Sequence, residues 1–409
     1  MGSAPAWADA ARAAAAERLA ALPPLTGQEE EWRFTPPTDL ALEGPEPEAA
    51  GDGFGPLAAE VADDRSAELM SVDGAEPTVG RAGLPDGVVV DDLAEALATH
   101  EALVRERLYS LVGFEGKPGA LNAARWESGT FVYVPRGVEV ELPVEALLVA
   151  SGGRGRVFGR TLVIVDEGAK ATVIDRFSSP DLPGTAQASS VAELFVAQGG
   201  ELEHVAVIDW GAGVRHHAIV AAHVGRDAQA RSVVITLGGD VVRVEPTLHC
   251  AGPGADGRAL GLYLAAGHQH FEHRVISRHE APNAYSNLLY KGAIKDAAHT
   301  VFFGNLVVPP GAPGTDAYQT NRNLVLNEGA RADTIPFLEI ETAEVRCSHA
   351  GAVGRVDDEH LFYLRSRGVP EAVAKQLIVE GFFQEVLDEI RLEELRGVLS
   401  EAIAAKVAT

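Results

Sequence analysis

The chain has 409 residues, of which 46% are hydrophobic and 23% charged, and its formal net charge is −25. This composition is typical of folded globular proteins and supplies enough apolar side chains for a large core. The strong negative charge argues against nucleic acid and anionic membrane surfaces as partners, because both would be repelled. At this length we expect two or three domains, or a repeating architecture that escapes the size limit of a single core.

The cysteine count and the hydrophobic pattern indicate in which cellular compartment the protein is found. Two cysteines, Cys250 and Cys347, cannot form a disulfide framework, and they are too few to hold a four-thiolate iron–sulfur cluster alone. No apolar run approaches the roughly 18 residues of a membrane span. Charged residues also interrupt the alanine-rich N-terminus where an export signal would need an apolar centre. We therefore expect a cytoplasmic protein.

Residues 1–120 are predicted to form a mostly helical N-terminal domain. An amphipathic helix is expected over about residues 1–22, ended by two prolines. The segment EEEWRFTP, residues 29–36, is predicted to be a loop held by its two aromatic side chains. Apolar residues at helical spacing predict another helix over 91–112.

Residues 121–345 change to short strand-like segments broken by turn residues, and an internal repeat appears. An apolar residue, two polar or small residues and a turn residue recur, with the turn at Gly137, Gly168, Gly199, Asp227, Gly267, Ala297 and Gly329. These turns are separated by 31, 31, 28, 40, 30 and 32 residues. Such a period predicts the coils of a mainly β, parallel β-helix core. A β-sandwich would also have short strands, but it would give no reason for the period.

Residues 346–409 are predicted to form a C-terminal helical domain. Asp357 and Asp358 are typical of a capped helix start, Gly368 ends that helix, and Pro370 fits the first turn of the next. Apolar side chains follow at helical spacing in larger number than a two-helix tail could bury. Part of this apolar face should therefore pack on the core or on another protein.

Cys347 and His349 lie where strand-like sequence gives way to helix, within residues 338–368. In a strand, residues two apart point to the same face, so a thiolate and an imidazole could lie side by side. That pair suits zinc, iron or an iron–sulfur cluster. A half-buried cysteine beside a hydrogen-bonded histidine is the alternative, and the two residues alone leave both interpretations open.

Other candidate residues carry weaker signals. His268, His270 and His273 resemble a metal cluster, but in a strand His273 would point away from the other two, so a three-ligand site would need a bend. Cys250 is predicted to be a buried structural thiol. The chain contains neither a GxxxxGK[ST] phosphate loop nor a GxSxG nucleophile elbow.

Several motifs together resemble the SufB/SufD family of iron–sulfur cluster assembly proteins. They are EEEWRFTP (29–36), SNLLYKGAIKDAAHTVFFG (286–304), TNRNLVL (320–326), PFLEIETAEVRCSHAGAVGR (336–355) and DDEHLFYLRSRGVPEAVAKQLIVEGFF (357–383). The compact length, the EEEWRFTP start and the absence of an acidic sequence after Cys347 resemble the SufD branch more than the SufB branch. One departure is Ala350-Gly351-Ala352, where the family usually reads Gly-Ala-Thr.

The resemblance implies a right-handed parallel β-helix with helical domains at both ends. It also implies a non-catalytic scaffold subunit that pairs with a SufB-like subunit, binds a SufC-like ATPase through its C-terminal helices, and forms a possible homodimer in isolation. Cys347 and His349 match the family's Cys-Ser-His, which implies that they bind a transient iron–sulfur cluster or iron shared with the SufB-like partner. No tightly bound cofactor is expected in the isolated subunit.

Two other functional classes are alternatives to a scaffold subunit. A β-helix enzyme acting on carbohydrate or acyl substrates would need a charged groove or a six-residue repeat, and the period here is near 30. A homodimeric storage or metal-binding protein would use the segment around His268.

Overall fold

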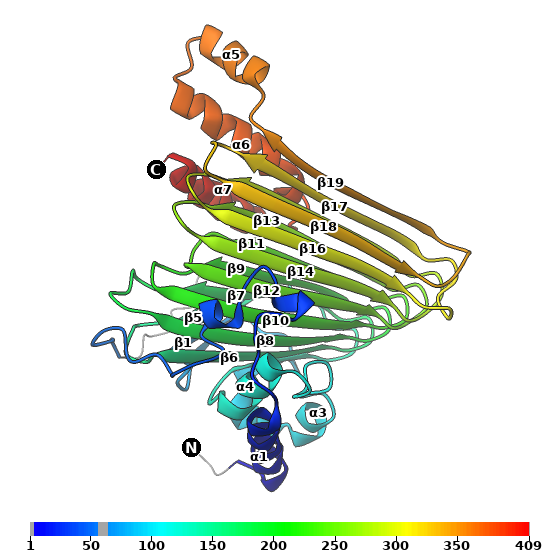
Figure 1. Cartoon of the computed structure of the whole chain (residues 1–409). Coiled ribbons are helices and arrows are strands. Elements are labelled where there is room, and N and C mark those ends of the chain that lie inside the picture. The colour runs from blue at the N-terminus through cyan, green and yellow to red at the C-terminus, as the bar shows by residue number, and fades with distance from the viewer. Residues whose placement is uncertain (1–3, 56–63, 409) are drawn as a thin grey trace.

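The computed structural model describes residues 4–55 and 64–408. In this part of the chain, two sheets face each other, and the chain alternates between them so that each coil adds one strand to each sheet (Figure 1). The result is a β-solenoid of about 8 turns with helices at both ends. The mainly β, helix-flanked β-helix predicted from the sequence is therefore confirmed.

The strands that follow β3 pair in parallel within each sheet, whereas β2 and β3 pair antiparallel with their neighbours. Sheet A has the spatial order β19 (Arg346–Arg355), β17 (Asp316–Val325), β15 (Tyr285–Ile294), β13 (Asp256–Ala265), β11 (Gln229–Thr236), β9 (Glu201–Asp209), β7 (Lys170–Ser178), β5 (Val144–Val149), β1 (Ala67–Val72) and β2 (Thr78–Arg81). Sheet B has the order β18 (Arg331–Ile340), β16 (His299–Val308), β14 (His270–His279), β12 (Val241–Cys250), β10 (Val214–Val224), β8 (Ala186–Val196), β6 (Arg156–Val165), β4 (Thr130–Val134) and β3 (Val89–Asp92).

Seven successive turns from sheet B to sheet A, from the one after β4 to the one after β16, each contain a left-handed residue. These residues, all with positive φ, are Gly137, Gly168, Gly199, Asp227, Gly254, Asn283 and Gly314. Their spacings are 31, 31, 28, 27, 29 and 31 residues. Glycine, asparagine and aspartate tolerate this conformation best, which explains why these residue types recur.

This ladder corrects part of the predicted repeat. The first four predicted turns lie on this side of the solenoid, but Gly267, Ala297 and Gly329 lie in the turns from sheet A back to sheet B. The 40-residue interval is therefore one coil of 27 residues, from Asp227 to Gly254, plus a half-coil of 13.

The helices pack at both ends of the solenoid. They are α1 (Ala6–Ala21), α2 (Leu93–Thr99), α3 (Glu101–Arg105), α4 (Lys117–Arg125), α5 (Asp358–Ser366), α6 (Glu371–Leu387) and α7 (Glu393–Ala408), with 3-10 turns η1 (Glu30–Trp32) and η2 (Pro37–Leu40). The single helix predicted over 91–112 is wrong, because His100, at φ −126°, leaves the helical region between α2 and α3. Among the described residues, no helix is long and apolar enough to cross a membrane.

The C-terminal helices divide into a docked and a projecting part. α6 and α7 bury Phe383, Val386 and Leu399 against the outer face of sheet A, which confirms that part of their apolar face packs on the core. α5 buries none of its residues and projects beyond the last coil (Figure 1). The predicted division between residues 345 and 346 stays a prediction, although β19 continues sheet A to Arg355.

Candidate functional site

The solenoid ends in two strands that are each paired along one edge only. β18 and β19 are the terminal strands of their sheets, each has ten residues, and no described strand pairs with their free edges. The opposite ends of the sheets are the four-residue antiparallel strands β2 and β3. Short strands protect a sheet edge, whereas long straight edges are templates for pairing with another chain. The last coil is thus an open end.

Cys347 and His349 both lie on β19 at this open end. Cys347 is in register with Ala317 of β17, and His349 with Gln319. Cys347 is half-buried against the solenoid core, and His349, two residues further along the strand, points to the same interior side but is exposed. The structure therefore brings the two predicted side chains onto one face.

The surroundings of Cys347 favour its neutral form. Burial raises the pKa of the Cys347 thiol, with Asp316 adding to the shift, while the backbone of Ala317 opposes it. Because the thiolate is the metal ligand, binding of a cation there must displace a proton.

Two polar groups near this end lack partners. Gln319 Oε1 and Thr334 Oγ1 are buried and accept no hydrogen bond within the described residues. Thr334 lies on β18, facing β19, because a Cβ built on Gly351 would be 3.2 Å from its Cγ2 and Oγ1 atoms. Thr334 could not be predicted from the sequence as part of this site, since its position depends on how two strands of one coil face each other. Buried polar atoms normally have partners, so these two indicate an incomplete surface.

The residues Ala350-Gly351-Ala352, which differ from the usual family sequence, lie on β19. Gly351 points inward, toward Thr334, whereas Ala352 lies on the opposite face of β19 from Cys347 and His349. A threonine hydroxyl at position 352 would therefore point away from the candidate site.

Cys347 and His349 do not form a complete metal site. Within the described residues, no group of three or more histidine, cysteine, aspartate or glutamate side chains could hold a metal ion. Iron–sulfur and zinc sites need about four protein ligands. Any cluster here would have to take its other ligands from outside the described residues.

The predicted histidine cluster does not assemble. His268 is exposed in the turn before β14, and His270 Nε2 lies 2.7 Å from Thr35 Oγ1 on the outer face. His273 points inward and stacks on Tyr263 at 4.7 Å. Cys250 is fully buried and burial raises its pKa to about 12, which confirms a structural thiol.

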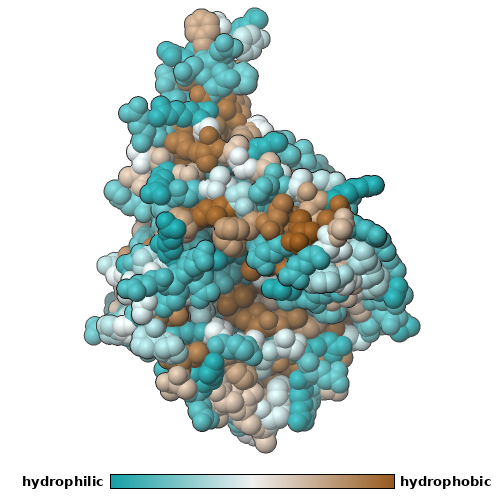
Figure 2. All heavy atoms as spheres, turned by 45° about the vertical axis from the view of Figure 1, so that its right-hand side comes forward, coloured by the Kyte–Doolittle hydropathy of each residue, from teal (hydrophilic) through white to brown (hydrophobic). Residues whose placement is uncertain are grey.

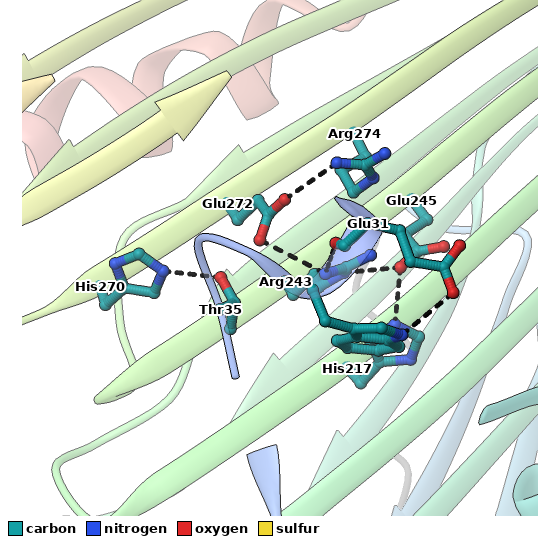
Figure 3. A network of polar contacts seen from close by, with 9 residues as sticks. Glu31, Thr35, His217, Arg243, Glu245, His270, Glu272 and Arg274 are labelled. Atoms are coloured by element: carbon teal, nitrogen blue, oxygen red, sulfur yellow. Dashed lines mark hydrogen bonds and ion pairs between the residues drawn. The ribbon is translucent and has the colours of Figure 1, made fainter. Parts of the chain in front are cut away.

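A second polar network fixes the segment 29–36 on the outer face of sheet B (Figure 3). The Arg243 guanidinium lies 3.9 Å from the centre of the Trp32 ring and donates to the Glu31 carbonyl at 2.6 Å. Arg243 is held in turn by Glu245 at 2.6 Å and Glu272 at 3.4 Å. The predicted aromatic anchor at Trp32 is confirmed, since its side chain is buried.

These features define a class: a helix-flanked β-solenoid whose last coil has two free strand edges and presents an inward-facing cysteine and histidine. The family model described as "SUF system FeS cluster assembly, SufBD core domain" matches residues 148–382. The chain belongs to this SufB/SufD family of iron–sulfur cluster assembly proteins, as its motifs predicted.

Individual relatives agree with the family. An iron–sulfur cluster assembly SufBD family protein of Mycobacterium tuberculosis is 41% identical over 68% of this chain and 71% of its own length. SufD of Bacillus subtilis is 31% identical over 78% of this chain and 74% of its own length. SufB of the same organism is 30% identical over 75% of this chain and 66% of its own length. The identities to SufD and SufB are too similar to assign this chain to one of the two branches.

Proposed function

We propose that the chain is a non-catalytic, SufD-like scaffold subunit that pairs with a SufB-like subunit and a SufC-like ATPase in the cytoplasm to build and transfer nascent iron–sulfur clusters. The observation that carries this proposal is the open last coil, with two potential ligands on its inner face. The SufD branch is favoured because Ser348-His349-Ala350 follows Cys347 in place of an acidic sequence.

Pairing at the open end would complete the site. A partner that adds strands to β18 and β19 satisfies their free backbone groups and extends both sheets. Its side chains then reach the space beside His349 and the unpartnered Gln319 and Thr334 oxygens. In isolation, the same edges are available to a second copy of this chain.

Iron and sulfide are substrates of this site. The exposed His349 imidazole would bind iron through a ring nitrogen, and Cys347 would assist once its proton is displaced. ATP-driven dimerisation of the ATPase would change the relative placement of the two scaffold subunits and open the shared site.

The C-terminal helices supply a surface for the ATPase. Phe362 of α5 is 73% exposed, Tyr363 57% and Leu377 of α6 46%. Figure 2 shows hydrophobic surface gathered near the projecting C-terminal part. Contiguous exposed apolar side chains of this kind mark protein interfaces. The chain has no GxxxxGK[ST] phosphate loop of its own, so in this proposal the ATPase activity belongs to the partner.

Replacing His349 tests the proposal. We expect His349→Ala, co-expressed with both partners, to retain complex formation but to lose most of the iron and sulfide measured after anaerobic purification. His268→Ala is the matched control, because His268 is an exposed histidine in the turn before β14, away from both the open end and α5. Unchanged iron and sulfide in His349→Ala would exclude His349 as a ligand.

A further inference from the structure

A second, outward-facing site lies on the side of the solenoid that bears the segment 29–36. A cleft of about 580 Å³ separates this segment from the outer face of β14, β16 and β18. We propose that the cleft binds an extended segment of a partner protein in which apolar or aromatic residues alternate with lysine or arginine. This surface is distinct from the inward-facing site of Cys347 and His349.

The floor of the cleft is apolar and only partly buried. It is formed by Phe303, Ile335 and Phe337, while Phe34 lines the wall. The Phe303 and Phe337 rings are 5.2 Å apart, and Phe337 keeps 44% of its surface exposed. The Arg274 guanidinium lies 4.0 Å from the centre of the Phe303 ring. The floor therefore offers aromatic anchoring surface of the kind that dominates binding energy at interfaces.

The rim of the cleft is negatively charged. Four carboxylates line it, those of Glu29, Glu30, Glu31 and Glu339. Within the described residues, none of the four forms an ion pair with a basic side chain, whereas the lining Arg274 is paired with Glu272 at 3.4 Å. Arg33 is the other basic lining residue. The unpaired charge of the rim is thus predominantly negative, which complements a cationic segment.

A buried acceptor lies beside the same floor. Asn305 is on the same face of β16 as Phe303, and its Nδ2 donates to Glu339 Oε1 at 2.7 Å. Its Oδ1 is buried without a hydrogen-bond partner in the described part of the chain. The hydrogen bond from Asn305 thus holds the Glu339 carboxylate in place at the rim of the cleft.

The cleft is already shaped for a ligand. Its wall, the segment 29–36, is held by the Trp32–Arg243 stack, the Glu31 carbonyl and the contact between Thr35 and His270 (Figure 3). Its floor is made of β14, β16 and β18, which pair with one another along nearly their full length. Binding to a rigid site costs less conformational entropy than binding to one that must be ordered.

The test uses the full chain and two capped hexapeptides, Lys-Phe-Lys-Leu-Lys-Phe and its charge-reversed counterpart Glu-Phe-Glu-Leu-Glu-Phe, in titration calorimetry. We expect only the basic peptide to bind, and we expect binding to weaken by about threefold or more when NaCl rises from about 50 to about 300 mM. Phe337→Ser should weaken binding about tenfold. Phe54→Ser is the matched control, because Phe54 is also 44% exposed but lies outside the cleft, and it should leave binding unchanged.

The outcomes separate this proposal from its rivals. Equal binding of both peptides, or equal binding by wild type and Phe337→Ser, would overturn it. Concentration-dependent self-association that Phe337→Ser abolishes would instead assign the cleft to a second copy of the chain. His349→Ala should bind the basic peptide normally, so failure of the cluster proposal and failure of this one are distinguishable.

Discussion

Buried histidines make the stability of this protein depend on pH. Burial lowers the pKa of His216 and His273 to about 3 and that of His270 and His279 to about 4. In the unfolded chain a histidine has a pKa near 6.5, so from about pH 6.5 down to the folded-state pKa the unfolded chain binds more protons. Stability is therefore greatest above about pH 6.5 and falls as the pH falls, by about 2 kcal/mol per histidine at pH 5.

We expect urea unfolding to show this loss between pH 7 and pH 5. His273→Gln should reduce the difference by the share of one histidine, because glutamine does not titrate. An equal pH dependence in wild type and His273→Gln would contradict the assignment of the loss to buried histidines.

The two faces of β19 predict opposite results at neighbouring positions. Ala352→Thr restores the family hydroxyl on the outward face, so we expect unfolding free energy and iron content to change little. Gly351→Val places a branched side chain against Thr334, where even a Cβ would approach to 3.2 Å. We expect this variant to lose about 1 to 3 kcal/mol of stability, measured by thermal or urea unfolding. A larger loss in Ala352→Thr than in Gly351→Val would contradict the inferred orientation.

At the scale of single residues, the sequence predicted those side-chain orientations that are set within a single strand. Cys347 and His349 were expected to share a face because side chains alternate along any strand. Their neighbours were not predictable in the same way. Thr334 meets Gly351 only because β18 and β19 face each other within one coil, and Gln319 lies beneath His349 only through the register of β17 with β19.

At the scale of elements, α5 and α6 differ in what their aromatic side chains do. Phe383 is fully buried between α6 and sheet A, whereas Phe362 of α5 is 73% exposed. We expect Phe383→Ala to cost about 3 to 5 kcal/mol and to raise hydrogen exchange in α6. Phe362→Ala should leave stability unchanged and weaken pull-down of the ATPase partner. Loss of stability in Phe362→Ala would show that α5 packs on the chain and is not free for a partner.

The place where a segment packs depends on long-range contacts that a sequence pattern does not contain. The segment 29–36 was expected to be a loop held by its aromatic side chains. The surface on which it packs includes Arg243, which is 212 residues away from Glu31 in the sequence. The repeat could be recognised in the sequence because turn residues recur in successive coils. The sequence did not show on which side of the solenoid each turn lies, since Gly267, in a turn on the opposite side, has the same local pattern.

At the scale of the whole molecule, the open end decides how the subunit assembles. A new coil stacked on β18 and β19 would bury side chains that now face the open interior. Ile340 is the last residue of β18, on the same inward side as Leu338, and it keeps 37% of its surface exposed. A charge there would be tolerated in the isolated chain and penalised only after pairing, which is how natural sheets block edge association.

We therefore expect Ile340→Lys to leave the unfolding midpoint of the isolated subunit nearly unchanged and to weaken association with the SufB-like partner by about tenfold or more, because a buried unpaired ammonium is costly. Leu142→Lys is the control, since Leu142 is 41% exposed but lies just before β5, far from the open end in the strand order. Light scattering of the purified pair measures the complex. Normal association of Ile340→Lys would place the partner elsewhere on the molecule, and Cys347 and His349 would then have no source of additional ligands at the open end.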